Sequence, residues 1–536
     1  MKKSIITIIA LMFVMTSFAQ EKKMFTPEDA SYNNYDVYPK SKSFKWLGDS
    51  DKFVFTEDNV IKFRNPGEKS SHELLSLDML NGIAKDNGIG DFKRLPNITW
   101  NDENSGYFYK MNDGSIVLYT LNISEKAIKK VTAYPANAEN ATLNEKSMRI
   151  AYTIGNDLYI ADGDRTLRLT ENPEHVIAGQ SVHRNEFAID GGIFWSPDGN
   201  KLAYYLMDES MVTDYPLVDI TTRIAEAKPI KYPMAGMTSH IVKLHVYDIA
   251  AGTDVVMKTG EPEEHYLTAI TWNNDNEKIY IGILNRGQDT LNFNEYNALN
   301  GDFNKTIFHD EDAQYVEPQG PAYFLPGSTT EFVWLAQRDG YYHIWLHNTK
   351  TLKAKQIEKG KYVVTSFDGF DEKGNAYYTS TEVSPLQRHF YKVNLKNGKK
   401  VQLTKKHGTH KVLPSKSGRF FIDNYSSTDI PRAAEIVDEK GRFFDFLYTA
   451  ENPIADYNIG VTEIDTIKAE DGQDLYTRII KPYNFDPNKK YPVIVYVYGG
   501  PHAQLITDTW LAGAGIYLNY LAQEGFIVFT VDNRGS

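Results

Sequence analysis

The chain has 536 residues, which exceeds one ordinary domain, and 41% of them are hydrophobic, enough to fill large cores. A formal net charge of −12 argues against nucleic acid and anionic membranes as partners, because an acidic surface repels both. The sequence contains no cysteine, which excludes disulfides, thiol catalysis and cysteine metal sites. Aromatic residues make up 13% of the chain and favour strands, so a mainly β protein is expected.

The beginning of the chain has the pattern of a secretory signal peptide. Two lysines after Met1 precede an apolar run over residues 5–15, and small residues follow before a cut near Ala19 or Gln20. The run is too short to span a bilayer comfortably, and no later segment reaches transmembrane length. We therefore predict that residues 1–20 are a cleaved signal and that the protein is exported. Its expected location is periplasmic or extracellular, including the cell surface, without a transmembrane segment.

Residues 34–455 repeat one pattern, in which an aromatic or apolar residue is followed by a short polar turn and an alternating strand. Openings are clear at Trp46, Trp195 and Trp272, and fainter copies begin near Trp100, Leu143, Phe324, Phe370 and Leu413. These make about eight units, most of them roughly 43 to 55 residues apart, which is close to the size of a four-stranded β-propeller blade. An array of β-sandwiches or a solenoid is the competing interpretation. The longer interval from Trp195 to Trp272 predicts an insertion over Met207–Thr238.

The pattern changes in the last part of the chain. Residues 456–536 begin with a predicted hairpin over 458–481 and continue with strands and a helix in alternation. Val493–Tyr498 is an unbroken apolar run that predicts a strand buried on both faces. Trp510–Glu524 has apolar residues at helical spacing, and Phe526–Val531 is a second predicted buried strand. An open α/β sheet does not end after its second buried strand, so we expect this domain to be incomplete as given.

Two motifs resemble those of a known family. The turn Trp195-Ser-Pro-Asp-Gly199 and the strand Tyr491-Pro-Val-Ile-Val-Tyr-Val-Tyr-Gly-Gly-Pro501 are similar to motifs of the prolyl oligopeptidase clan of serine peptidases, and within it of the dipeptidyl peptidase IV family. The resemblance implies a fold that is mainly β plus α/β. An eight-bladed β-propeller over residues 34–455 would be followed by the incomplete start of an α/β-hydrolase domain over residues 456–536. In such a fold the two domains enclose the active site.

A third segment, Gln180–Phe187, narrows the resemblance. It occupies the register in which dipeptidyl peptidases carry two adjacent glutamates, and this chain has Asn185 and Glu186 there. That variant resembles bacterial prolyl tripeptidyl peptidases more than the dipeptidyl enzymes. The resemblance implies a serine exopeptidase, without a cofactor, that releases tripeptides or dipeptides after proline from peptides with a free N-terminus.

Glu186, with Asn185 beside it, is the candidate anchor for the α-ammonium group of the substrate. An aminopeptidase must measure distance from that group, and a fixed carboxylate in a partly dry cavity does so through a charge-assisted hydrogen bond of about 1.5–3 kcal/mol. A single carboxylate would hold the ammonium less closely than two, in agreement with a longer released unit. The alternative is a solvated glutamate on a loop. His183 and Arg184 nearby are either a buried charge partner or part of an exposed loop.

Tyr498 and Glu317 complete the candidate site. The resemblance implies that Tyr498 donates a hydrogen bond to the oxyanion of the tetrahedral intermediate. A core tyrosine is the alternative, and Tyr496 is the competitor on the same strand face. Tyr315–Pro318 aligns with a segment that carries an aromatic–arginine pair in dipeptidyl peptidases, and here the pair is Val316-Glu317. Glu317 is therefore either a second acid facing the cavity or a surface residue.

The catalytic triad is missing from the sequence as given. No Gly-x-Ser-x-Gly segment occurs in residues 1–536, and the resemblance implies that the serine, aspartate and histidine all lie C-terminal to a segment like Asp532–Ser536. We therefore expect this chain alone to be inactive. A non-catalytic propeller that binds peptides or proteins is the rival interpretation. The sequence does not decide the oligomeric state, and a homodimer is one option.

No metal site is predicted. The sequence has no His-Glu-x-x-His motif, and phosphate-binding glycine loops are absent. His407 and His410 are the nearest pair among 13 scattered histidines, and both are interpreted as loop residues.

Overall fold

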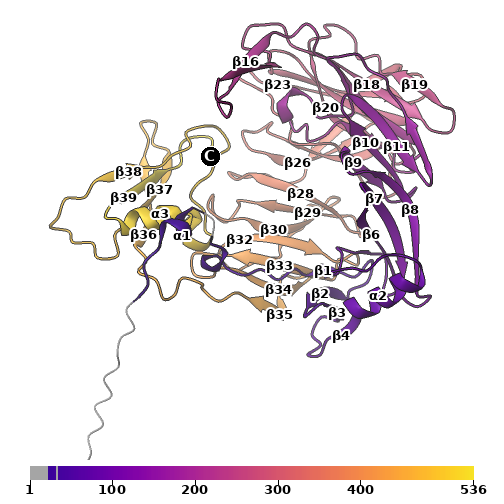
Figure 1. Cartoon of the computed structure of the whole chain (residues 1–536). Coiled ribbons are helices and arrows are strands. Elements are labelled where there is room, and N and C mark those ends of the chain that lie inside the picture. Colours follow the sequence, from indigo (N-terminus) through magenta and orange to yellow (C-terminus); the bar gives the residue numbers. More distant parts are fainter. Residues whose placement is uncertain (1–21, 32–33) are drawn as a thin grey trace, which may run out of the picture. The chain divides into compact units, whose positions relative to one another are not determined.

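The computed structural model of the chain describes residues 22–31 and 34–536, so the predicted signal peptide lies outside the described residues (Figure 1). The chain divides into two compact units. The larger unit consists of Lys42–Tyr425 and Ala433–Tyr448, and the described residues of the smaller unit are 22–31, 34–41, Ser426–Arg432 and Thr449–Ser536. The smaller unit is therefore built from three separate stretches of the chain.

The larger unit is an eight-bladed β-propeller, as predicted, and its blades follow one another along the chain (Figure 1). Seven blades are sheets of four consecutive strands, and the fourth blade has five strands. The strands of the first four blades are β1–β4 (Lys45–Trp46, Phe53–Glu57, Val60–Arg64, His72–Ser76), β5–β8 (Thr99–Trp100, Ser105–Asn112, Ser115–Asn122, Ala127–Pro135), β9–β12 (Glu139–Asn144, Arg149–Ile154, Asp157–Asp162, Arg165–Arg168) and β13, β14, β15, β18 and β19 (Val176–Ala178, Ile193–Trp195, Lys201–Asp208, Ile241–Asp248, Thr253–Val256). Those of the last four are β20–β23 (Tyr266–Trp272, Lys278–Leu284, Thr290–Asn297, Phe303–Glu311), β24–β27 (Tyr323–Phe324, Glu331–Ala336, His343–Asn348, Lys353–Gln356), β28–β31 (Val364–Phe370, Asn375–Ser380, His389–Asn394, Lys400–Gln402) and β32–β35 (Thr409–Pro414, Phe420–Ser426, Ala433–Asp438, Phe443–Thr449).

The repeated tryptophans explain why the pattern recurs in the sequence. Each of the three clear repeat openings uses its indole N–H to bind a backbone carbonyl of the preceding blade. Trp195 donates to the carbonyl of Thr142 at 2.9 Å, and Trp272 donates to that of Phe194 at 3.0 Å. Trp46 donates to the carbonyl of Leu413 at 2.8 Å, so the first blade is joined in the same way to the eighth. A buried indole N–H needs such a partner, which ties the motif to blade docking.

Hydrophobic clusters fill all eight interfaces between neighbouring blades. Side chains alternate along each strand, so adjacent residues serve different interfaces. Tyr204 on β15 packs toward the third blade, whereas its neighbour Tyr205 packs toward the fifth. The last interface joins the first and eighth blades through Phe44, Phe53, Ile422, Ala434 and Ile436. A ring without open ends excludes the solenoid and sandwich-array interpretations.

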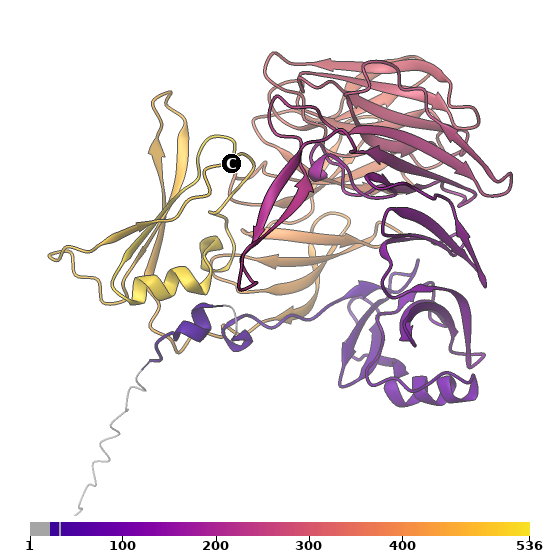
Figure 2. The same ribbon diagram turned by 45° about the horizontal axis from the view of Figure 1, so that its top comes forward.

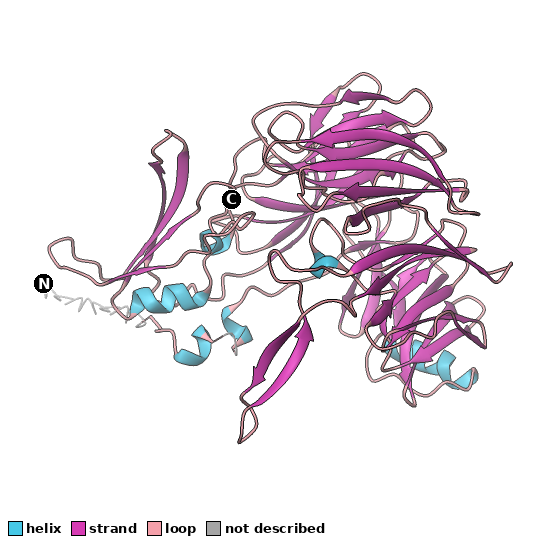
Figure 3. Ribbon diagram, turned by 90° about the horizontal axis from the view of Figure 1, so that it is seen from above, coloured by secondary structure: helices cyan, strands magenta, loops and turns pink. Residues whose placement is uncertain are grey.

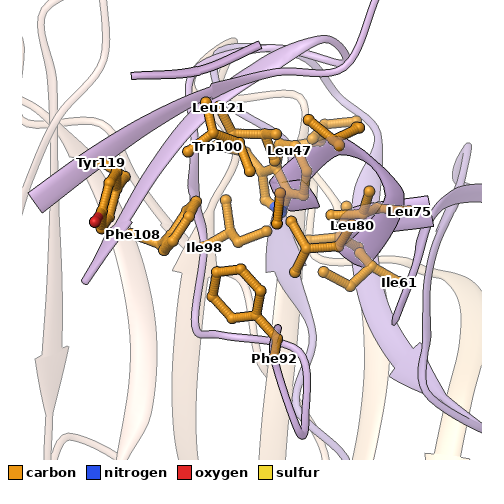
Figure 4. Packing of buried hydrophobic residues seen from close by; sticks show 14 of the residues in the cluster. Leu47, Ile61, Leu75, Leu80, Phe92, Ile98, Trp100, Phe108, Tyr119 and Leu121 are labelled. Carbon is orange, nitrogen blue, oxygen red and sulfur yellow. The ribbon is translucent and has the colours of Figure 1, made fainter. Parts of the chain in front are cut away.

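Figure 4 shows the interface between the first and second blades. Leu47, Ile61 and Leu75 of the first blade meet Trp100 and Phe108 of the second in one buried cluster. Helix α2 (Leu77–Asp86) follows β4 and adds Leu80 to the cluster. Ser76 caps this helix, because its side-chain oxygen accepts a hydrogen bond from the backbone N–H of Met79.

The predicted insertion in the fourth blade is confirmed. Between β15 and β18 the chain forms a two-stranded ribbon of β16 (Asp214–Asp219) and β17 (Glu226–Lys231), which lies inside the predicted range Met207–Thr238. The ribbon forms a sheet of its own and stands apart from the strands of the blade (Figure 3).

The smaller unit contains a mixed sheet in the order β36-β37-β39-β38, with strands Val461–Lys468, Asp474–Lys481, Ile527–Val531 and Val493–Val495 in that order. The predicted hairpin is confirmed as the antiparallel pair β36 and β37, and β38 lies parallel to β39. Helix α1 (Pro27–Ala30) and the short helix Tyr35–Val37 precede the propeller in the chain, whereas Trp510–Gly513 and α3 (Ile516–Gln523) connect β38 to β39. Helix α1 lies beside α3 (Figure 2), and the side chain of Gln523 on α3 hydrogen-bonds both the N–H and the carbonyl of Phe25.

Two predictions for the smaller unit are wrong. The strand predicted over Val493–Tyr498 is β38, which is short, and Val495 is 62% exposed. β38 lies at the edge of the sheet, where β39 is its one strand neighbour among the described residues, and the side chain of Val493 is likewise 56% exposed. The predicted helix over Trp510–Glu524 begins only at Ile516, because Leu511 and Ala512 have positive φ angles of 59° and 56°. The strand predicted over Phe526–Val531 is confirmed as β39.

Arg478 on β37 explains the late start of α3. Its guanidinium is buried and donates to the carbonyls of Leu505 and Ala512, both at 2.7 Å. These bonds hold the chain in the left-handed turn that precedes the helix. Within residues 22–31 and 34–536, no helix is long and apolar enough to cross a bilayer.

Candidate functional site

The loop between β13 and β14 carries Asn185 and Glu186, and its backbone is strained. A short helical turn, His183–Asn185, has positive φ angles at each of its three residues, and Phe187 and Ala188 have φ angles of 60° and 58°. Left-handed backbone at non-glycine residues costs on the order of 1–3 kcal/mol each and persists only where the surroundings enforce it. Such strain is concentrated at functional sites, so the loop is a good candidate for one.

Contacts on both sides of the loop enforce this backbone. The hydroxyl of Ser181 donates to the carbonyl of Ile189 at 3.0 Å and also to the side-chain oxygen of Asn185. From the fifth blade, the hydroxyl of Thr268 donates to the carbonyl of Phe187. Gly192 allows the two ends of the loop to meet, since a Cβ there would lie 2.0 Å from the carbonyl oxygen of Gln180.

His183 is a neutral support of the loop and not a charge partner for Glu186. Its Nδ1 lies 2.8 Å from Nε2 of His240, and the ring contacts Tyr266 edge to face at 4.7 Å. Burial is the main cause that lowers the pKa of His183 to about 2 and that of His240 to about 4, so both are uncharged at neutral pH. Arg184 is exposed and lies over the ring of Tyr232 at 4.7 Å. Neither residue is therefore a buried charge partner of Glu186, because His183 is buried but uncharged and Arg184 is charged but exposed.

Glu186 and Asn185 are both exposed. The backbone N–H of Glu186 donates to the carbonyl of His183 at 3.1 Å, which fixes the residue at the end of the helical turn. Within the described part of the chain, no side chain forms a hydrogen bond or ion pair with the Glu186 carboxylate. A ligand can therefore reach it, since the side chain is exposed.

Glu317 lines a cavity of about 450 Å³ between the fifth and sixth blades. The hydroxyl of Tyr342, a buried residue, donates to Oε2 of Glu317 at 3.1 Å and holds the carboxylate in place. Of the two alternatives for Glu317, the structure supports an acid that faces a cavity. Val316 beside it packs against the same hydrophobic cluster as Phe187. The two segments predicted to bind substrate thus share one core within the larger unit.

Arg338 also lines this cavity. Its role could not be predicted from the sequence, because the residues around it have the pattern of an ordinary hairpin turn. Its guanidinium binds both carboxylate oxygens of Asp310, at 2.7 and 3.2 Å. The rings of Phe308 and Trp345 each lie 4.9 Å from it. The positive charge of Arg338 is therefore held by Asp310 and by two aromatic faces.

Tyr498 lies in the smaller unit, after the end of β38, and is 70% exposed. The alternative of a core tyrosine is therefore wrong in this structure. Its ring leans over Gly500, where a Cβ would lie 2.6 Å from the ring, so the glycine is needed for this arrangement. Tyr496 extends the pairing with β39 through its N–H, which donates to the carbonyl of Phe529 at 2.9 Å. The role of Tyr498 as an oxyanion donor stays a prediction.

His410 is not a loop residue, contrary to the prediction. It lies on β32, is buried, and its Nδ1 is 2.9 Å from both carboxylate oxygens of Asp423. His407 does lie in the loop before β32. Among the residues that the structure describes, no group of three or more histidine, aspartate or glutamate side chains is arranged to hold a metal ion.

Comparison with known proteins identifies the class to which this propeller and its attached sheet belong. The family model described as "Dipeptidyl peptidase IV (DPP IV) N-terminal region" matches residues 107–432, which is more than half of the chain. The chain belongs to the dipeptidyl peptidase IV family.

Three relatives illustrate the similarity. The crystal structure of a putative dipeptidyl aminopeptidase IV from Bacteroides ovatus is 37% identical, with a TM-score of 0.86 over 95% of this chain and 74% of that chain. The crystal structure of Porphyromonas gingivalis dipeptidyl peptidase 4 shares the fold, with a TM-score of 0.77 at 23% identity over 96% of this chain and 74% of that one. Dipeptidyl peptidase 4 of Arthroderma otae is 24% identical over 93% of this chain and 67% of its own length.

Proposed function

We propose that this chain belongs to an exported serine exopeptidase that releases short N-terminal peptides after proline, as dipeptides or tripeptides. Membership of the dipeptidyl peptidase IV family supports peptidase activity, and the relatives are named dipeptidyl peptidases or aminopeptidases. The observation that carries the proposal is Glu186, an exposed carboxylate without a protein partner among the described residues, on a loop whose strained backbone is held from both sides.

Glu186 is proposed to bind the free α-ammonium group of the peptide. The turn fixes the backbone of Glu186, and a charge-assisted hydrogen bond from its carboxylate to the ammonium group contributes about 1.5–3 kcal/mol. This contribution corresponds to roughly 10- to 100-fold in affinity. Recognition of a free N-terminus distinguishes an aminopeptidase from an endopeptidase, which makes this residue the decisive one to test.

The test is peptide binding to the full chain, measured by isothermal titration calorimetry. The ligands are Ala-Ala-Pro-Ala and Ala-Pro-Ala amides, each with a free or an acetylated N-terminus. We expect the free peptides to bind about 10- to 100-fold more tightly, and Glu186→Gln to remove most of that difference. Asp190→Asn, which neutralises another exposed carboxylate of the same loop, is the matched control and should leave it intact. Equal affinity of free and acetylated peptides for the unmodified chain would refute the proposal.

Turnover is a separate part of the proposal. Tyr498 is proposed as the oxyanion donor, supported by its exposure beside Gly500. In the protein produced by its own cells, Tyr498→Phe should lower kcat by about 100-fold or more while peptide affinity changes little. Mass spectrometry of the products decides between dipeptide and tripeptide release. Peptide binding without turnover in that protein would instead favour a non-catalytic peptide-binding propeller.

A further inference from the structure

Arg286 is the one arginine among the described residues whose guanidinium is partly buried and has no close partner. It lies in the turn between β21 and β22, where its Nη2 is 3.5 Å from the carbonyl oxygen of Met237 and its Cζ is 5.9 Å from the ring centroid of Tyr266. All other described arginines are exposed, ion-paired, or bonded to backbone carbonyls at 3.0 Å or less. A guanidinium has five N–H donors, so most of those of Arg286 can bind a ligand.

The turn that carries Arg286 is bonded to the segment that follows the fifth blade. The carbonyl of Gln288 accepts from the backbone N–H of Val316 at 2.7 Å, and the carbonyl of Asp289 accepts from that of Asp312 at 3.0 Å. The backbone from which the Arg286 side chain projects therefore has a fixed position.

Tyr266 connects Arg286 with the loop that carries Glu186. The ring of Tyr266 is buried and contacts His183 edge to face at 4.7 Å and Phe187 at 4.6 Å, and these two residues lie on either side of Glu186 in the loop. The charge of Arg286 is also one of the causes, after burial and the neighbouring histidine, that lower the pKa of His183. Arg286 therefore lies beside the proposed anchor for the α-ammonium group, within the larger unit.

The acidic residues closest to Arg286 in the structure have other partners. Asp289 lies in the same turn, and its carboxylate accepts from the side-chain amide of Asn285 at 2.7 Å. Glu317 lies in the segment bonded to the turn, and its carboxylate accepts from the hydroxyl of Tyr342. Within the described part of the chain, neither of them nor any other carboxylate forms an ion pair with Arg286.

A neutral carbonyl oxygen is the acceptor that suits this guanidinium. An anionic ligand group would be repelled by Glu186, Asp289 and Glu317, whereas a carbonyl oxygen carries no net charge. A peptide bound by its α-ammonium group presents its first carbonyl groups directly beside that anchor. Carbonyl groups are also present in every peptide, whatever its side chains.

We infer that Arg286 binds a backbone carbonyl oxygen of one of the first two residues of the peptide whose α-ammonium group is bound by Glu186. The inference rests on the proposed function, because it assigns Arg286 to the same bound peptide. It adds a second anchor, of opposite charge to the first, so that the peptide is held in position and in direction. Because this contact involves the backbone, it does not select among side chains.

Replacement of single carbonyl oxygens by sulfur tests the contact, because a thioamide sulfur is a weaker acceptor than oxygen. The ligands are Ala-Ala-Pro-Ala amide, its two thioamide forms with sulfur at the first or the second residue, and the acetylated parent peptide. Glu-Ala-Pro-Ala and Gln-Ala-Pro-Ala amides are included to detect recognition of an acidic side chain. Binding to the full chain is measured by calorimetry, and one of the two thioamides should bind about 5-fold more weakly than the parent peptide.

Two variants and a control connect this effect to Arg286. Arg286→Met should weaken binding of the parent peptide about 10-fold and abolish the thioamide effect, while the preference for free over acetylated peptides persists. Arg286→Lys, which keeps the charge but not the planar set of donors, should restore part of the affinity. Arg165→Met removes an exposed arginine of the third blade and should behave like the unmodified chain. Thermal unfolding verifies that each variant is folded.

The possible results separate the two proposals. A thioamide effect that survives in Arg286→Met overturns the inference, and so does the absence of such an effect at both positions in the unmodified chain. An effect of Arg286→Met on the glutamate peptide but not on the glutamine peptide would assign Arg286 to a side chain and overturn it as well. In each case a preference for free over acetylated peptides would still support the proposed function. Equal binding of free and acetylated peptides to the unmodified chain, by contrast, would refute the proposed function and this inference with it.

Discussion

At the scale of single residues, His410 and Asp423 form a buried ion pair within the eighth blade. His410 is 4% exposed and Asp423 is 1% exposed, and His410 Nε2 also hydrogen-bonds the carbonyl of Lys406. Burial alone would lower the pKa of His410, but the hydrogen bond and charge of Asp423 outweigh it, so the pKa is raised. The folded protein therefore binds a proton here more tightly than the unfolded chain does.

This pair predicts a pH dependence of stability. Because the folded pKa is the higher one, the stabilisation is complete below the unfolded pKa of about 6.5 and is lost as the pH rises through the folded value. The free energy of unfolding, measured with urea from pH 5.5 to 9, should therefore decrease toward alkaline pH. Asp423→Asn should cost about 3–5 kcal/mol at pH 6 and flatten this part of the profile.

The matched control for this prediction is His72→Asn, since the side chain of His72 is half exposed beside Glu68. It should leave the profile almost unchanged. An Asp423→Asn protein with the same slope as the unmodified chain would contradict the assignment of the slope to His410.

Residues of this kind could not be predicted from the sequence. His410 follows Gly408 in a polar stretch, which is typical of a loop, and its partner Asp423 lies 13 residues away on the next strand. The pairing depends on the register of two strands and not on a local motif. Glu186 and Glu317, in contrast, are candidates because of their place in segments that resemble those of a known family, whereas their exposure and contacts depend on neighbours from other blades.

At the scale of elements, the loop over residues 180–192 depends on one glycine. A Cβ on Gly192 would lie 2.0 Å from the carbonyl oxygen of Gln180, so Gly192→Ala must displace one end of the loop. We expect a loss of about 1–3 kcal/mol in the free energy of unfolding, the usual cost of overpacking. Glu186 should lose its position as well, so the preference for free over acetylated peptides should decrease.

The neighbouring glycine offers a matched control for this substitution. A Cβ on Gly191 would meet no atom within 4 Å, so Gly191→Ala should change neither the thermal midpoint nor peptide binding. Calorimetric unfolding and peptide titration measure both quantities. If the two variants behaved alike, the close approach at Gly192 would not be what holds the loop.

The elements of the smaller unit show what a sequence pattern can determine. The apolar run Val493–Tyr498 indicated a strand correctly, but burial depends on what covers its faces and edges, and β38 has one strand neighbour. Helical spacing over Trp510–Glu524 likewise indicated α3, while its first residue is set by the hydrogen bonds of Arg478 to Leu505 and Ala512. Local pattern therefore predicts the type of an element better than its limits or its environment.

At the scale of the whole molecule, the propeller is closed by the interface between its first and eighth blades. Trp46 is central to it, through its bond with Leu413 and its contact with Phe53. Arg64 on β3 and Asp445 on β35 add an ion pair of 2.8 Å to the same interface. The approximate number of repeats could be predicted from the sequence, because three blades open with a clear tryptophan motif and the others with fainter copies of it, whereas the contacts that close the ring could not.

Weakening this interface should affect the larger unit as a whole. Trp46→Ala should lower its free energy of unfolding by about 3–5 kcal/mol, since the substitution removes a large packed side chain and leaves the Leu413 carbonyl without its donor. Trp46→Phe should cost less, because the packing is partly retained. Leu299→Ala, at a residue 65% exposed, is the control. Denaturant unfolding followed by near-ultraviolet circular dichroism measures all three, and unchanged stability of Trp46→Ala would contradict a closing role.

The closing contact also has a consequence for synthesis of the chain. Trp46 and Leu413 are 367 residues apart, and ribosomes add about 5–20 residues per second. The partner of the first blade therefore leaves the ribosome roughly 20 to 70 s after the first blade itself. During that time Phe44 and Phe53 lack their native partners from the eighth blade, Ile422, Ala434 and Ile436. The nascent first blade therefore exposes an apolar face, the kind of surface that makes an incomplete chain prone to aggregate, long before the finished propeller exists.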